Sequence, residues 1–203
     1  MQLRTRAAGA AVTAVFAAAT LAATAGPAAA ATTVHFLTKG QWPQGDRWGD
    51  WHSKPVKDGL RDKAAFCLEG ILPTSRTQYR EFFSDVDAGG IQYVSKLATS
   101  TDAKALITRL RNRVPVCADR FADALTGGAA EVVVYPFVDL EEGLSRRGVF
   151  TSGTGTEFGT VLWAFGRDGR YVTVVELDQI GKKSGAPVAK FTATAKKALD
   201  QLL

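Results

Sequence analysis

Polar and apolar residues alternate along two stretches in the first half of the chain. Residues 79–84 and 91–97 each show the period of two that is typical of a strand, and residues 87–90 between them are Asp, Ala, Gly and Gly. A turn at these four residues would make the two stretches antiparallel neighbours. We therefore predict a β-hairpin at this point of the chain.

The period then changes to that of a helix, which Thr101 or Ser100 can cap at its N-terminus. Arg109 falls on the polar side of this helix, and the apolar side consists of Ala103, Leu106, Ile107 and Leu110. Pro115 is expected to kink or end the helix, because proline has no N–H and its ring clashes with the preceding turn. A second short helical segment should follow and stop at Gly127-Gly128.

Four more strands are predicted in the second half, at residues 131–135, 144–150, 158–165 and 171–177. Pro136 either ends the first of these strands or places it at an edge of the sheet. Residues 158–165 are apolar on both faces, which favours a central strand with Trp163 buried. Asp168-Gly169 is a strong hairpin signal. A last helix should start near Pro187, with an apolar stripe of Val188, Phe191, Ala195, Ala198, Leu199 and Leu202.

This order of elements indicates an α+β fold, because strands followed by a helix occur twice. We expect an antiparallel sheet with the helices packed on one face, in two strand-strand-helix halves. The domain is predicted at residues 66–203. Residues 32–65, called the wrap below, form an irregular Trp-rich segment in which Pro, Gly and Asp recur too often for a long element.

The N-terminus has the layout of a secretory signal peptide. Arg4 and Arg6 precede an Ala-rich apolar run, and small residues follow at Ala28, Ala30 and Ala31. We predict a signal peptide at residues 1–31, with an uncleaved membrane anchor as the alternative. Cleavage would leave about 170 residues, which is enough for one domain with a sizeable core.

The charge of the chain is mild. Without Arg4 and Arg6 it carries 23 basic and 20 acidic side chains. A nucleic-acid-binding protein would show clustered positive charge with interleaved aromatic residues, so we expect no nucleic-acid partner. Weak, salt-sensitive attraction to anionic envelope polymers stays open.

Export changes the interpretation of the two cysteines, Cys67 and Cys117. Exported proteins form disulfides in oxidising compartments, and an even count of two leaves a single pairing. We predict a Cys67–Cys117 disulfide. Closing a loop of this length is worth roughly 4 kcal/mol by the chain-entropy estimate.

The wrap has two interpretations. Its aromatic residues can pack as a lid over the core, or Trp48, Trp51 and His52 can line a ligand groove, since flat apolar rings with a polar edge stack on sugars and other rings. In the second case we expect the binding site where the wrap meets the first hairpin, close to Arg80.

The order of several short motifs resembles a known family. The motifs are Phe36-Leu37-Thr38 before Gln41-Trp42-Pro43, Trp48 ahead of Phe66-Cys67-Leu68, Val116-Cys117-Ala118 after the helix, the hairpin at 163–175, and an Ala-rich last helix. Together they resemble the PknH-type extracellular sensor domain of actinobacterial proteins, which occurs on receptor kinases and as free-standing secreted proteins. The resemblance implies an antiparallel sheet with helices on one side, a cleft proposed to bind a small extracellular ligand, and no known enzymatic activity. One cysteine pair stands here where the kinase sensor has two.

Catalytic and metal-binding patterns are weak. A Ser-His-Asp or Cys-His site would have to use His52, and nothing supplies a nucleophile elbow. Residues 151–156 superficially resemble a phosphate-binding loop, but no Lys follows and the next predicted element is a strand. Asp139, Glu141 and Glu142 suit a solvated turn better than a carboxylate pair for sugar hydrolysis. His52 with Asp46 and Asp50 lacks a recognised metal spacing.

The sequence therefore predicts a secreted, non-catalytic, sensor-like protein that binds a small or extended extracellular ligand, without cofactor or metal. The expected partner is a small molecule or an envelope glycan, and we expect a monomer with no stable membrane insertion after signal cleavage. The alternative is a hydrolase of cell-envelope polymer.

Overall fold

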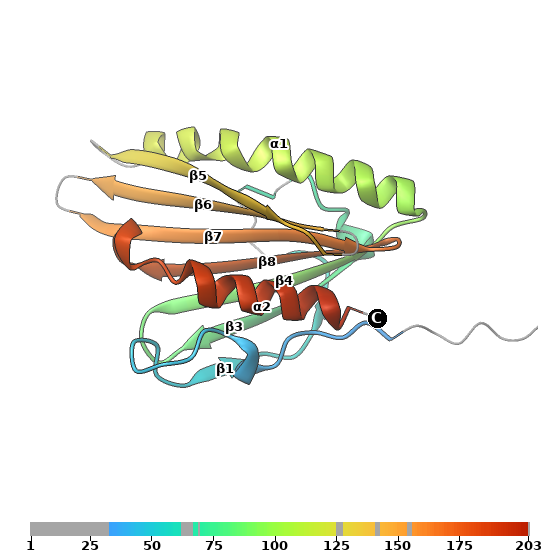
Figure 1. Cartoon of the computed structure of the whole chain (residues 1–203), viewed down its shortest axis with the longest axis horizontal. Helices are drawn as coiled ribbons and strands as arrows, with labels where there is room; N and C mark the ends of the chain where they lie inside the picture. Colours follow the sequence, from blue (N-terminus) through green and yellow to red (C-terminus); the bar gives the residue numbers. More distant parts are fainter. Residues whose placement is uncertain are drawn as a thin grey trace, which may run out of the picture. The chain divides into compact units, whose positions relative to one another are not determined.

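One antiparallel sheet dominates the structure, which is a computed structural model (Figure 1). The part of the chain that the structure describes holds eight paired strands, in the order β1-β3-β4-β8-β7-β6-β5, with β2 also paired to β3. Their bounds are β1 (Trp51–Ser53), β2 (Lys57–Asp58), β3 (Thr77–Ser84), β4 (Ala88–Lys96), β5 (Ala129–Val138), β6 (Leu144–Gly153), β7 (Thr156–Asp168) and β8 (Tyr171–Ile180). The β4–β8 pairing joins the two halves of the chain.

The structure describes residues 33–61, 67–68, 70–124, 128–140, 143–153 and 156–202. All of them belong to one compact unit, Thr32–Leu203. The predicted signal peptide at residues 1–31 lies outside the described residues. Within them, neither α-helix is long and apolar enough to cross a membrane.

The two α-helices pack on opposite faces of the sheet. Alternate residues of β7 divide between them: Trp163 belongs to the core cluster of α1 (Ser100–Ala124), and Leu162 belongs to that of α2 (Val188–Asp200). The α+β class and the antiparallel sheet are confirmed, but the expectation that both helices share one face is wrong. Each face of the central strands is apolar, so each needs its own cover.

The apolar stripe predicted for α1 is buried and consists of Ala103, Leu106, Ile107 and Leu110, with Val114 buried beyond it. In the stripe predicted for the last helix, Phe191, Ala195, Ala198, Leu199 and Leu202 are buried and Val188 is half-buried. Pro115 lies inside α1, which continues to Ala124, so the helix does not end at the proline and the second predicted segment is part of α1. Packing of the stripe against the sheet outweighs the hydrogen bond that proline cannot donate. The short 3-10 helices are η1 (Lys39–Gln41), η2 (Thr74–Arg76) and η3 (Lys183–Gly185).

The first hairpin turns earlier than predicted. β3 ends at Ser84 and β4 begins at Ala88, so Gly89 and Gly90 belong to the strand and not to the turn. A Cβ atom at Gly90 would lie 2.5 Å from Cη2 of Trp42. Glycine here leaves room for the indole ring of Trp42 against the sheet, a requirement that the local sequence does not reveal.

The second half forms a four-strand meander, and all four predicted strands are present with longer bounds. β5 lies at the edge of the sheet with Pro136 inside it, which confirms the edge interpretation of that residue. Gly127 and residues 154–155 lie outside the described residues.

Candidate functional site

The wrap meets the first hairpin through a short strand pairing. β1 runs antiparallel to β3, with Trp51 opposite Ser84 and His52 opposite Phe83. Arg80 lies on β3 a few residues away. Trp51 and His52 of β1 and Arg80 of β3 therefore lie on paired strands, and Trp48 precedes β1 by a few residues. We call this region the wrap–hairpin junction.

Trp48 and Trp51 lie inside the protein. They are 4% and 2% exposed, and both indole N–H groups donate hydrogen bonds within the chain. Nε1 of Trp51 donates to the carbonyl oxygen of Pro43 at 2.8 Å, and Nε1 of Trp48 donates to Oε1 of Gln179 at 3.2 Å. This burial is what the lid interpretation describes. A contribution of these two residues to ligand binding stays a prediction.

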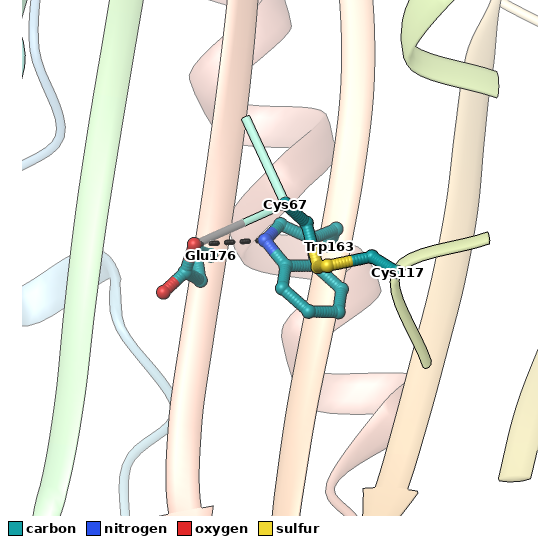
Figure 2. The surroundings of a disulfide bond; sticks show 4 residues. All are labelled: Cys67, Cys117, Trp163 and Glu176. Atoms are coloured by element: carbon teal, nitrogen blue, oxygen red, sulfur yellow. Dashed lines mark hydrogen bonds between the residues drawn. A yellow bond between two sulfur atoms is a disulfide. The ribbon is translucent and has the colours of Figure 1, made fainter. Parts of the chain in front are cut away.

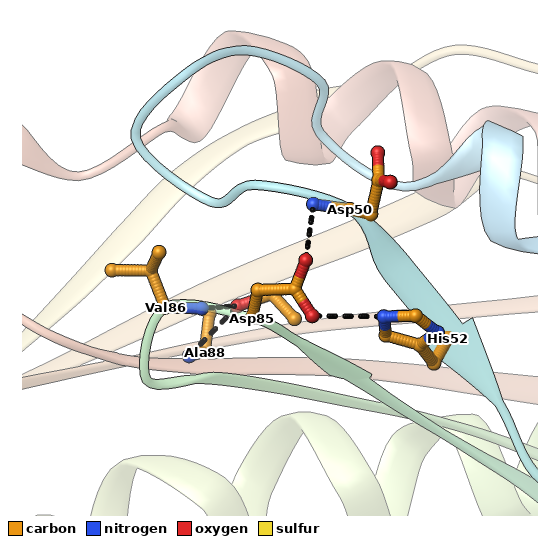
Figure 3. Close-up of polar contacts among 6 residues, drawn as sticks. Asp50, His52, Asp85, Val86 and Ala88 are labelled. Atoms are coloured by element: carbon orange, nitrogen blue, oxygen red, sulfur yellow. Dashed lines mark hydrogen bonds and ion pairs between the residues drawn. The ribbon is translucent and has the colours of Figure 1, made fainter.

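His52 and Asp85 form the exposed part of the junction (Figure 3). Nε2 of His52 lies 2.8 Å from Oδ1 of Asp85, and Oδ2 of Asp85 accepts a hydrogen bond from the backbone N–H of Asp50 at 3.2 Å. The bond from His52, and then that from Asp50, lowers the pKa of Asp85. The imidazole also stacks on Phe83, with ring centroids 5.2 Å apart. The pair orients the histidine, as a catalytic or a binding histidine would require.

Arg80 connects the wrap to β3. Its guanidinium donates to the carbonyl oxygens of Lys54 at 3.0 Å and Leu37 at 3.2 Å, and to Oγ of Ser53 at 2.9 Å. It also lies over the ring of Phe82. The cation is thus used to hold three points of the wrap.

A larger hollow lies at the other end of the hairpin, where β3 begins, β4 ends and β8 begins. We call it the end pocket. Its volume is about 740 Å³, within the range of small-molecule sites. It is lined by Thr33, Val34, Asp58, Thr74, Ser75, Arg76, Thr77, Gln78, Val94, Lys96, Leu97, Ala98 and Tyr171. Apolar and polar side chains are therefore mixed in its wall.

Tyr171 is the notable member of this wall. The residue is 3% exposed, and its hydroxyl has no hydrogen-bond partner among the described residues. Nζ of Lys96 lies 5.6 Å from the ring centroid and Cζ of Arg170 lies 5.8 Å from it. A buried hydroxyl without a partner costs free energy, so a ligand that supplies one would gain from this site.

The charge of the end pocket favours a ligand that is not cationic. Arg76 and Lys96 are its basic residues, and Asp58 is the one acid in its lining. Oδ1 of Asp58 accepts a hydrogen bond from Nε2 of Gln78 at 2.9 Å. An acceptor group on a ligand would therefore meet two cations and a hydroxyl.

The predicted disulfide is present on the α1 face of the sheet, opposite to the face that carries Tyr171. Cys67 and Cys117 are joined, with their Cα atoms 5.4 Å apart, and they belong to the same core cluster as Trp163 (Figure 2). Nε1 of Trp163 donates to Oε2 of Glu176 at 2.8 Å. Burial raises the pKa of Glu176 to about 7, against the opposing effect of the Trp163 hydrogen bond.

A buried carboxyl with a raised pKa can mark a catalytic acid. Glu176, however, is 8% exposed and lies in the core beside Trp163 (Figure 2). Glu176 therefore occupies the position of a core residue and not that of a residue in an open site. The hydroxyl of Tyr93, on the same face, is also buried without a partner among the described residues.

The remaining sequence candidates give no site. Asp139 is exposed, and Glu141 and Glu142 lie outside the described residues. In the described ranges no group of three or more His, Cys, Asp or Glu side chains is placed to hold a metal ion, Asp46, Asp50 and His52 included. The stretch 151–156 connects two strands, β6 and β7.

Sequence reasoning missed the end pocket. Lys96 and Tyr171 are opposite each other in the β4–β8 pairing but 75 positions apart in the chain. Arg76 arrives from η2, before β3. Only the register of strands from the two halves brings these residues together, so no local sequence motif predicts the pocket.

No protein-family model and no curated protein matches this chain. Among solved structures, it is similar to the extracellular domain of PknH from Mycobacterium tuberculosis, at 14% sequence identity and a TM-score of 0.35. The match covers 74% of this chain and 82% of that one.

Proposed function

We propose that the protein is a secreted, non-catalytic, sensor-like domain that binds a small extracellular ligand in the end pocket. The observation that carries this proposal is the end pocket itself, with the buried hydroxyl of Tyr171 in its wall and no partner for that hydroxyl among the described residues. Membership of the PknH-type sensor family is part of the same proposal. Secretion is supported by the N-terminal sequence pattern and by the disulfide.

The lining defines the chemistry of the ligand. Val34, Val94 and Leu97 supply an apolar wall, while Arg76 and Lys96 supply donors. A molecule with an apolar body and a neutral or anionic acceptor group would match both parts. A volume of about 740 Å³ accommodates a metabolite or a short fragment of an envelope glycan.

A thermal-shift screen against envelope fragments and metabolites tests the proposal, because a ligand that binds only the folded state raises the melting temperature by mass action. Tyr171→Phe removes only the hydroxyl and should reduce the shift that the best hit produces. Lys96→Gln should reduce it further if the ligand is anionic. Arg109→Ala, on the exposed side of α1, is the matched control and should leave the shift unchanged.

The same screen separates the end pocket from the site predicted from the sequence. If the hit binds at the wrap–hairpin junction, His52→Ala and Arg80→Ala will abolish the shift and Tyr171→Phe will not. If no compound raises the melting temperature, or if turnover of a fragment is detected, the proposal of a non-catalytic binding domain fails.

A further inference from the structure

A second hollow lies between the wrap and α2. It is lined by Gln41, Trp42, Pro43 and Gln44 from the wrap, and by Lys190, Ala193, Thr194 and Lys197 from the helix. Its volume is about 510 Å³. We call it the helix groove. It shares no lining residue with the end pocket.

The indole of Trp42 is fixed with its N–H edge away from the sheet. Its Cε3, Cζ3 and Cη2 atoms lie against Gly90 of β4, within 2.9 Å of where a Cβ would stand. Nε1 is on the other side of the ring system. The ring is also held from the side by Trp51, whose centroid is 5.2 Å away. The edge of Trp42 that carries Nε1 therefore faces away from Gly90 of β4, and Trp42 is one of the residues that line the groove.

This donor is the exception among the four tryptophans of the chain. Nε1 of Trp48, Trp51 and Trp163 each has an acceptor within the protein. Nε1 of Trp42 is buried and finds no acceptor in the described ranges. Buried indole N–H groups usually have a partner, so this one calls for an acceptor from outside the chain.

Hydrogen bonds between the wrap and α2 hold both walls of the groove in place. Oγ1 of Thr194 donates to the carbonyl oxygen of Gln41 at 2.7 Å, and Nε2 of Gln41 donates to Oε1 of Gln201 at 2.9 Å. Nε2 of Gln44 donates to the carbonyl oxygen of Trp42 at 2.7 Å. The groove is thus formed before any ligand arrives, which lowers the entropic cost of binding.

The charged groups of the groove are all donors. Lys190 uses one donor on the carbonyl oxygen of Gln44 at 2.6 Å, and an ammonium group has three. The ammonium of Lys197 makes no hydrogen bond or ion pair with the described residues, and no acid is among the lining residues. Two cations and a buried N–H complement an anionic oxygen acceptor.

We propose that the helix groove binds a carboxylate or phosphate group, which accepts a hydrogen bond from Nε1 of Trp42 and pairs with Lys190 and Lys197. The group can belong to a small anion or to an acidic residue of an envelope polymer, since the groove is open along α2. This site is independent of the end pocket.

The test is a titration of the ¹⁵N-labelled protein with inorganic phosphate and, separately, with glucuronate, each at constant ionic strength against sodium chloride. The indole N–H signal of Trp42, assigned by its loss in Trp42→Phe, should move saturably and more than the other three indole signals. A shift with phosphate alone identifies a phosphate site, and a shift with glucuronate identifies a carboxylate site.

Lys197→Gln is the deciding variant, because it removes a charge without touching the core that Trp42 occupies. It should weaken binding by about tenfold, as expected for loss of a charge-assisted contact. Lys104→Gln, on the exposed side of α1, should leave the affinity unchanged, and so should Tyr171→Phe. If the Trp42 signal moves no more than in sodium chloride, a trapped water satisfies its N–H and the proposal is wrong. Equal affinities of Lys197→Gln and Lys104→Gln would also overturn it.

Discussion

Trp163 and Trp42 are equally buried, at 2% exposure each, yet their surroundings differ. Trp163 lies on the α1 face near the disulfide, and its N–H donates to the buried carboxyl of Glu176. Trp42, a residue of the wrap, lies on the α2 face against Gly90 of β4, and its N–H has no acceptor among the described residues. The indole N–H of Trp163 therefore has an acceptor within the protein, whereas that of Trp42 is left for an acceptor from elsewhere.

Whether a buried N–H has an acceptor within the protein indicates where a binding site can lie in a chain without a catalytic motif. A donor that the fold already satisfies contributes to stability and specifies the core. A buried donor beside a preformed groove costs stability, and binding can recover that cost. We therefore expect the Trp163 region to contribute stability, and the binding that we propose lies on the α2 face, with the helix groove and with Tyr171 of the end pocket.

The largest expected effect comes from breaking the Trp163 region. Trp163→Ala removes a fully buried ring and also leaves Glu176 without its donor. We expect the free energy of unfolding, measured by chemical denaturation, to fall by about 3–5 kcal/mol. Arg109→Ala, on the exposed side of α1, should change it by less than about 0.5 kcal/mol. Similar losses in the two variants would mean that the sheet does not bury Trp163.

Removing the disulfide tests the same region from its other side. Replacing Cys67 and Cys117 with serine should lower the free energy of unfolding by about 2–5 kcal/mol, the cost that native disulfides of secreted domains show. Below the melting temperature the folded variant should still bind the anion in the helix groove, because the groove is on the opposite face. Intact mass with and without alkylation checks that the native protein has no free thiol, and two alkylated cysteines would contradict the structure.

The pH dependence of stability isolates Glu176. Its pKa is about 7 in the folded protein and near 4.5 in the unfolded chain, so the folded state binds more protons between these values. Stability from this group is therefore fully present below pH about 4.5 and is lost as the pH rises to about 7. The loss amounts to roughly 3 kcal/mol if the whole shift applies. Glu176→Gln keeps an acceptor for Trp163 and should flatten this part of the profile; an unchanged slope would show that Glu176 is already ionised below pH 7.

Strands β3 to β8, both α-helices and the disulfide could be predicted from the sequence, because each follows from a local pattern, whereas β1 and β2 lie in the wrap, for which no strand was predicted. The alternation in β3 and β4, the stripe in α1 and the Asp168-Gly169 turn all occur within a few residues. The face of the sheet that each helix covers could not be predicted, because it depends on which strands pair. β4 and β8 become neighbours across the two halves, and only then does α2 lie opposite to α1.

The end pocket and the helix groove could not be predicted for the same reason. Lys96 meets Tyr171 through the β4–β8 register, and Trp42 reaches Lys197 through the packing of the wrap on α2. The sequence did identify the wrap as the segment that concentrates aromatic residues. It gave no means to tell that Trp42, and not Trp48 or Trp51, is the one whose N–H is left without an acceptor in the described structure.

The indole N–H groups of Trp163 and Trp42 should differ in what they contribute to stability, and a matched pair of substitutions measures this difference. Trp163→Phe and Trp42→Phe both remove an N–H and keep an aromatic ring, and the free energy of unfolding of each is measured without added anions. Trp163→Phe leaves a buried carboxyl unpaired, so it should cost about 1–3 kcal/mol more than Trp42→Phe, which removes a donor without a partner among the described residues. Equal costs, or a larger cost for Trp42→Phe, would contradict the account.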